Sequence, residues 1–132
     1  MVRQIAFSSL ARPGLRPADT SNIIGTSRSN NARDGITGAL IYSGESFLQL
    51  VEGADAALTA LWGRLAGDDR HRQLASLFDR SVAQRSFGDW RAGYMPEETL
   101  GSALTRWNGF TPPLPLVEVD ALLEFLRDAE TF

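Results

Sequence analysis

The sequence predicts an α+β fold: a ferredoxin-like β-α-β-β-α-β sheet with two helices on one face, plus C-terminal helices. Two observations predict it. Short β-type runs alternate with segments of helical spacing, and their order follows the split β-α-β pattern. The length of 132 residues suits one domain. We expect residues 1–95 to form the core, and residues 96–132 to pack on that core or on a partner as a helical extension.

The first strand and the first helix come from the N-terminal 30 residues. Residues 2–7 alternate as a strand does. Pro17 suits the first turn of a helix, which we expect to continue over residues 18–30. This helix has few large apolar residues, with Ile23 and Ile24 as the main exceptions. Such a helix either lines a cavity for a ligand or faces solvent, and the sequence leaves both interpretations open.

Four more β-type runs complete the predicted sheet. Residues 36–42 and 47–51 read as a hairpin, because only the short connection 43–46 separates them. Residues 73–81 predict a fourth strand. Residues 90–94 predict a short fifth strand.

Three further helices follow from the spacing of apolar residues. Leu58, Leu61 and Leu65 share one face of a helix, and Asp55 is its expected N-cap. Residues 97–107 begin with two glutamates, which the helix dipole favours. The apolar face of a final helix consists of Val119, Leu122, Leu123 and Leu126.

Composition and charge exclude several classes of function. The 13 basic residues are all arginine, and the net charge of −3 argues against a nucleic-acid partner. There is no cysteine, so disulfides, thiolate metal sites and cysteinyl–flavin adducts are excluded. One histidine, His71, is too few for a transition-metal site. We found no signal peptide and no long apolar run, so we expect a cytoplasmic protein without a membrane partner.

Gln49 is the first candidate for a binding role. It shares a strand face with Phe47 and Val51, so its amide is expected to be buried. A buried amide without a partner costs about 1–3 kcal/mol, whereas an amide beside a ligand can both donate and accept hydrogen bonds. A glutamine that faces solvent is the alternative.

The other candidates lie at the ends of the two predicted helices. Asn30 and Asn31 end the first helix, where an asparagine commonly serves as a C-cap. Arg70 and His71 follow the second helix. Taken alone, Arg70 is equally consistent with a charge on the surface, and His71 with a structural or exposed side chain. No serine–histidine–acid arrangement and no phosphate-binding glycine motif is present.

Taken together, four segments resemble the signatures of one family. Residues 30–40, 47–53, 68–71 and 87–90, and the spacing between them, are similar to those of BLUF domains, the sensors of blue light that use FAD. The resemblance covers roughly residues 2–95. It implies a short single-domain protein of this family, with a flavin held non-covalently between the two helices. FAD is the expected flavin, with FMN or riboflavin as alternatives.

The resemblance also implies roles for particular residues. Asn31 is expected to bind the polar edge of the flavin ring. Gln49 is expected near N5 and the C4 carbonyl, where its rearrangement marks the lit state. Arg70 is expected to reach the C2 carbonyl. Ile24 should pack against the ring with Asn30 close by, and His71 should lie near the pyrimidine side.

Two positions depart from the family pattern. Phe7 stands where the family has a tyrosine that bonds the switching glutamine, and Ala92 stands where a methionine usually follows Trp90 by two residues. A phenylalanine has no hydroxyl and is a poor electron donor, so the usual photocycle is in doubt. Trp90 is a candidate replacement donor, although an indole cannot return a proton through Gln49.

The resulting functional prediction is a blue-light photoreceptor domain that is not an enzyme. It would signal by contact with an unknown downstream protein and is expected to form a homo-oligomer. Two alternatives come from other classes: a small acylphosphatase-like enzyme, for which no phosphate-binding loop is evident, and an interaction domain without a cofactor.

Overall fold

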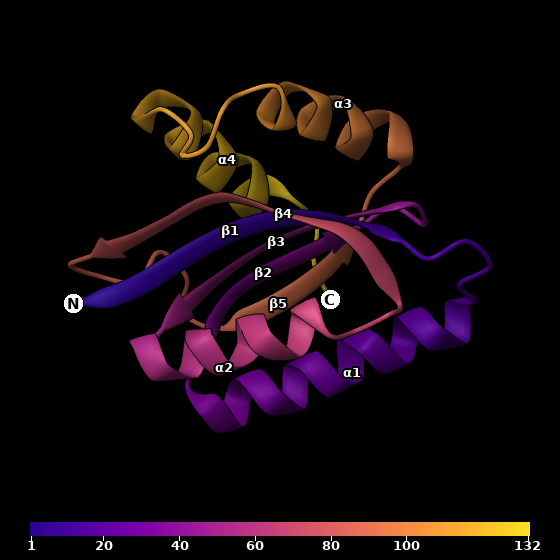
Figure 1. The fold of residues 1–132 in the computed structure, drawn as a ribbon, viewed down its shortest axis with the longest axis horizontal. Coiled ribbons are helices and arrows are strands. Elements are labelled where there is room, and N and C mark those ends of the chain that lie inside the picture. Colours follow the sequence, from indigo (N-terminus) through magenta and orange to yellow (C-terminus); the bar gives the residue numbers. More distant parts are fainter.

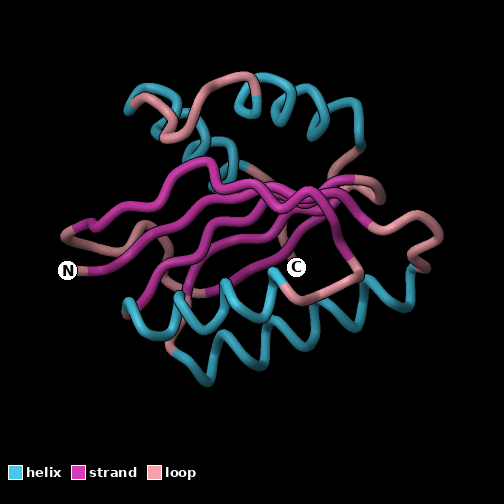
Figure 2. The backbone as a smooth tube through the Cα atoms, viewed as in Figure 1, coloured by secondary structure: helices cyan, strands magenta, loops and turns pink.

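The computed structural model describes all 132 residues as one mixed sheet between two layers of helices (Figure 1). Helices α1 and α2 cover one face of the sheet, and α3 and α4 cover the other (Figure 2). This arrangement confirms the predicted fold class. The elements in chain order are β1 (Val2–Ala11), α1 (Pro17–Asp34), β2 (Thr37–Tyr42), β3 (Ser46–Gly53), α2 (Asp55–Ala66), β4 (His71–Val82), β5 (Trp90–Tyr94), α3 (Glu97–Asn108) and α4 (Leu116–Asp128).

The strand order β4-β1-β3-β2-β5 places β1 and β3 in the middle of the sheet. All neighbours are antiparallel except β2 and β5, which run parallel. The register of β1 and β3 sets Phe7 directly opposite Gln49. Two residues that lie 42 positions apart in the chain therefore meet on adjacent central strands.

The element boundaries differ from the sequence prediction at β1, which continues past residue 7 to Ala11, and at two helix ends. Ala54, and not Asp55, is the N-cap of α2; Asp55 is the first helical residue, where its charge faces the helix dipole and binds Arg3 at 2.9 Å. Helix α1 continues past residue 30 and ends at Gly35, whose φ of 68° suits glycine. The longer helix puts Asn31 inside α1.

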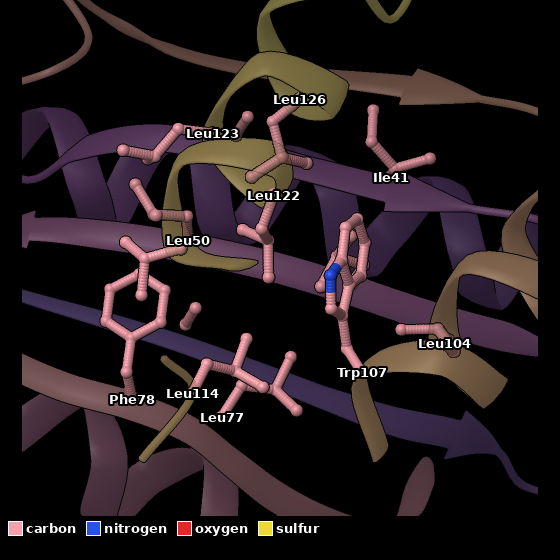
Figure 3. Packing of buried hydrophobic residues seen from close by; sticks show 14 of the residues in the cluster. Ile41, Leu50, Leu77, Phe78, Leu104, Trp107, Leu114, Leu122, Leu123 and Leu126 are labelled. Carbon is pink, nitrogen blue, oxygen red and sulfur yellow. The ribbon is translucent and has the colours of Figure 1, made fainter. Parts of the chain in front are cut away.

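The main apolar core lies between the sheet and the C-terminal helices (Figure 3). It is a cluster of 16 buried residues to which α4 contributes Leu122 and Leu126, β3 contributes Leu50 and α3 contributes Trp107. Burial of aliphatic side chains at this density is the principal stabilising contribution available to a domain of this size. None of the helices has the length and apolar character needed to cross a membrane.

Candidate functional site: a cavity between α1, α2 and the sheet

A cavity of about 300 Å³ lies between α1, α2 and the strands β1, β2 and β3. This volume is at the lower end of the range for ligand pockets. Its lining combines apolar side chains with amides, hydroxyls and one arginine–aspartate pair. The residues are Phe7, Ser9, Ile23, Thr26, Ser27, Asn30, Asn31, Leu40, Phe47, Gln49, Leu61, Arg64, Leu65, Asp68, Arg70 and His71.

Asn31 is the cavity residue whose side chain most clearly indicates a binding site for a ligand. It is 1% exposed, and neither its Oδ1 nor its Nδ2 has a hydrogen-bond partner within the chain. It is not the C-cap of α1, because Gly35 takes that position and donates its N–H to the backbone oxygen of Asn31. A buried amide that lacks a partner costs about 1–3 kcal/mol, so this side chain is suited to a ligand that supplies one donor and one acceptor.

Gln49 and Phe7 lie side by side on the wall formed by the sheet. Both are almost fully buried, at 5% and 2% exposure. The ring of Phe7 packs edge-on against Trp62 of α2, with the ring centroids 5.5 Å apart. Phe7 therefore fills space beside the Gln49 amide but offers it no hydrogen bond.

Arg70 enters the cavity from the loop that follows α2. Its guanidinium binds the carboxylate of Asp68, with Nη2 2.7 Å from Oδ2. This hydrogen-bonded pair holds the pKa of Asp68 below its usual value, although partial burial opposes the shift. Asp68 fixes the position of the guanidinium, which still has N–H donors for a carbonyl oxygen.

His71 lies next to Arg70 at the start of β4. Its Nε2 is 2.8 Å from the backbone oxygen of Leu65. A carbonyl only accepts, so Nε2 carries the proton, and the buried, unpartnered Nδ1 is an acceptor in the neutral ring. The imidazole, which lines the cavity, thus also has a buried polar atom that nothing in the chain satisfies.

Three residues expected at the site lie outside the cavity lining. Ile24 packs against the apolar cluster beside the cavity and lines a separate groove, while its neighbour Ile23 faces the cavity. Trp90 lines an adjoining cavity of about 320 Å³, to which Asn31 also contributes. Ala92 is fully buried in the same cluster as Trp90.

Ile23, Thr26 and Ser27 of α1 also line the cavity, beside the expected Asn30 and Asn31, and were not predicted as site residues. Together these five positions have the spacing of one helical face. A hydrophobicity pattern could not reveal this face because most of its residues are polar. On α2, Leu61 and Leu65 were recognised as apolar but not as cavity walls.

These residues fit a flat heteroaromatic ring with a polar edge. Apolar side chains from both helices and from β2 and β3 can contact its faces, while Asn31, Gln49 and Arg70 provide donors and acceptors in the lining. No group of three or more histidine, cysteine or acidic residues is placed to hold a metal ion.

Comparison with known families defines the class of the protein. The family model described as BLUF, sensors of blue-light using FAD, matches residues 2–93. The chain therefore belongs to the BLUF family of flavin-binding blue-light sensor domains, and the resemblance seen in the sequence is confirmed.

Particular relatives include subunits of light-activated enzymes. The photoactivated adenylate cyclase subunit beta of Euglena gracilis is 35% identical over 60 residues, which are 46% of this chain and 7% of that subunit. The alpha subunit is 33% identical over 60 residues, which are 46% of this chain and 6% of that subunit. The chain thus spans only a small part of the length of these relatives.

Solved structures agree with this assignment. BlrB, a BLUF protein in its dark state, superposes with a TM-score of 0.76 at 28% identity, covering 93% of this chain and 92% of that chain. The photo-activated state of BlsA gives a TM-score of 0.80 at 22% identity, covering 100% and 99%, and shows the shared fold. BlrP1 of Klebsiella pneumoniae gives 0.69 at 26% identity, covering 97% of this chain and 34% of that chain.

Proposed function

We propose that the cavity between α1 and α2 binds the ring system of FAD without a covalent bond. The observation that carries this proposal is Asn31, whose buried amide has no partner in the chain. We assign the polar edge of the ring to Asn31, Gln49 and Arg70, and its pyrimidine side to His71. We assign to Ile23 the packing role that the sequence suggested for Ile24, and Asn30 lines the same cavity.

FAD is the flavin that the family description names. The cavity residues supply contacts to the ring, which FAD, FMN and riboflavin share, so we expect all three to bind. Attachment through a thiol is excluded because the chain contains no cysteine. The family assignment argues against an acylphosphatase-like enzyme and against an interaction domain without a cofactor. We propose a sensor without enzymatic activity of its own.

When bound, the flavin supplies absorption of blue light and an acceptor for one electron. Gln49 holds hydrogen bonds at the polar edge and can exchange donor for acceptor by rotating its amide. Phe7, opposite Gln49, has no hydroxyl to supply an electron, a proton or a hydrogen bond to that amide. We therefore propose that the usual photocycle, with its stable red-shifted state, does not complete in this chain.

The output of the domain is proposed to be contact with a downstream protein. Relatives such as the Euglena cyclase subunits and BlrP1 are much longer than the part that this chain matches. By analogy, we propose that this chain acts as a sensor domain on a separate partner protein. We expect it to form homo-oligomers in the cytoplasm.

Two steps test the proposed function. The chain is loaded with FAD, washed and then denatured: we expect flavin to be retained by the folded chain and released entirely on denaturation. A light-minus-dark spectrum is then compared for the unmodified chain, Phe7→Tyr and Phe47→Tyr. We expect a red shift only in Phe7→Tyr, and we expect the shifted state to decay quickly because Ala92 provides less packing than methionine.

Phe47→Tyr is the matched control because it adds a hydroxyl to the same cavity but not opposite Gln49. Failure to retain flavin would refute the binding proposal. A normal, reversible red shift in the unmodified chain would refute the role assigned to Phe7.

A further inference from the structure

The last four residues wrap around the edge of the sheet and join its two helical layers. They leave α4 in extended conformation, with Ala129 at φ −66° and ψ 138°. The N–H of Phe132 donates to the oxygen of Ala92 on β5 at 2.8 Å, and Nη2 of Arg28 on α1 donates to the oxygen of Phe132 at 2.9 Å. We call residues 129–132 the strap. The C-terminal end lies below the sheet, on the side of α1 and α2 (Figure 1).

The strap covers part of the open edge of β5, to which it makes one backbone hydrogen bond, from Phe132 to Ala92. β5 is the outermost strand beside β2, and an edge strand presents unpaired N–H and C=O groups that can pair with an extended segment. The strap crosses β5 at Gly93, where a Cβ atom would overlap the backbone oxygen of Glu130. The absence of a side chain at this position lets an extended segment approach the strand closely.

A groove of about 480 Å³ lies beside the strap, and its lining carries no charged side chain. Its rim includes Tyr94 and Phe132, which are 60% and 70% exposed. Thr20, also in the lining, is 7% exposed, and its Oγ1 has no hydrogen-bond partner in the chain. A groove without charged side chains, which combines apolar residues with hydroxyls and lies beside a strand edge, suits an extended segment with an apolar side chain and a nearby backbone polar group.

Arg28 connects this edge to the proposed flavin site. Its guanidinium lies over the ring of Trp90, 5.5 Å from the ring centroid, while binding the strap. On α1, Arg28 precedes Asn31 by three residues, so both lie on neighbouring positions of one helical face. Arg28 thus contacts both the strap and Trp90, and lies one helical turn before Asn31 of the proposed flavin site.

We propose that the edge of β5 and the adjacent groove form a docking site for an extended segment of a partner protein that carries an aromatic or aliphatic side chain. The strap covers this site in cis and is released when the partner binds. Occupancy of the flavin site and release of the strap are linked through Arg28; this link rests on the proposed function. By reciprocity, each event changes the equilibrium of the other by the same factor.

The docking site is tested on the full chain with a fluorescent peptide that has the sequence of residues 127–132. Phe132→Pro removes the N–H donor to Ala92 and frees the strap without changing the edge, whereas Phe132→Leu keeps this donor. We expect the peptide to bind Phe132→Pro about tenfold more tightly than the unmodified chain or Phe132→Leu, because the tethered strap no longer competes.

The position of the peptide is tested by adding a second change to Phe132→Pro. Gly93→Ala should abolish binding, because its Cβ blocks the crossing point, while Gly25→Ala, with nothing within 4 Å of an added Cβ, should not. Equal affinities across these variants, or no binding to Phe132→Pro, would overturn the proposal. Self-association of the unmodified chain that Phe132→Pro abolishes would assign the edge to a second copy and would also overturn it.

The link to the flavin site is tested by amide exchange of Phe132 in the unmodified chain, with and without FAD. We expect its exchange rate to change on FAD binding, and Arg28→Gln to remove the change. If FAD binds and the rate stays the same, the link is wrong while the proposed function stands. If FAD does not bind, the proposed function fails, and the peptide experiment still decides the docking site in the flavin-free chain.

Discussion

The two faces of the sheet are packed in opposite ways although they share the same strands. Along β3, Leu48 and Leu50 point into the cluster of 16 buried residues under α3 and α4, whereas Phe47 and Gln49 line the cavity under α1 and α2. The centre of one face is filled by the chain's own side chains, although an open groove of about 1130 Å³ lies along α3 on that side. The other keeps about 300 Å³ and buried polar atoms without partners. The comparison shows that a stable core on one face allows the other to be shaped for a ligand.

The largest expected effect comes from a cavity made in the packed face. Leu122 is completely buried, so Leu122→Ala should lower the free energy of unfolding by about 2–5 kcal/mol, equally with and without FAD. Leu61 is in the wall of the flavin cavity, so Leu61→Ala should lower the free energy of unfolding less in the free chain than in the FAD-bound chain. Urea unfolding of both variants with and without FAD measures this. If FAD altered the destabilisation by the same amount in both variants, the two faces of the sheet would not differ in their contact with the flavin.

The contrast also explains which parts the sequence could predict. The core residues of α4, such as Leu122 and Leu126, follow helical spacing and were predicted as an apolar face. Thr26, Ser27 and Asn30 of α1 line the cavity while remaining exposed or half-buried, so their polar pattern is the same as that of a solvated helix surface. Whether Asn31 is a helix cap or a buried amide likewise depends on the residue at which α1 ends, and only the structure gives that residue.

A smaller effect is expected at Asn31, whose side-chain polar atoms have no partner on the cavity side of the sheet. Asn31→Ala should weaken FAD binding by about 1–3 kcal/mol, since the ring would lose a buried hydrogen-bonding partner. The stability of the free chain should stay the same or rise, because the two unpartnered atoms are removed. Asn22→Ala, at an exposed position of the same helix, is the control. FAD titration and urea unfolding give both quantities, and loss of free-chain stability alone would make Asn31 a structural residue.

The smallest effect concerns the pH dependence of the Asp68–Arg70 pair. The arginine lowers the pKa of Asp68 in the folded chain, so the pair stabilises the fold above the ordinary aspartate pKa. That contribution, below about 1 kcal/mol for a partly exposed pair, is lost as the pH falls through the lowered value. Asp68→Asn should lose the corresponding slope below a pH of about 4. Asp69→Asn, which is more exposed, should keep the slope; an unchanged slope in Asp68→Asn would contradict the assignment.

Amide hydrogen exchange of the whole chain, with and without FAD, tests the central claim most directly. If FAD occupies the cavity of the α1–α2 face, exchange should slow in residues 23–34 and 68–73 and around Gln49, while the amides of α3 keep their rates. Equal slowing in α3, or bound FAD with no slowing in α1, would show that the flavin does not lie on this face of the sheet.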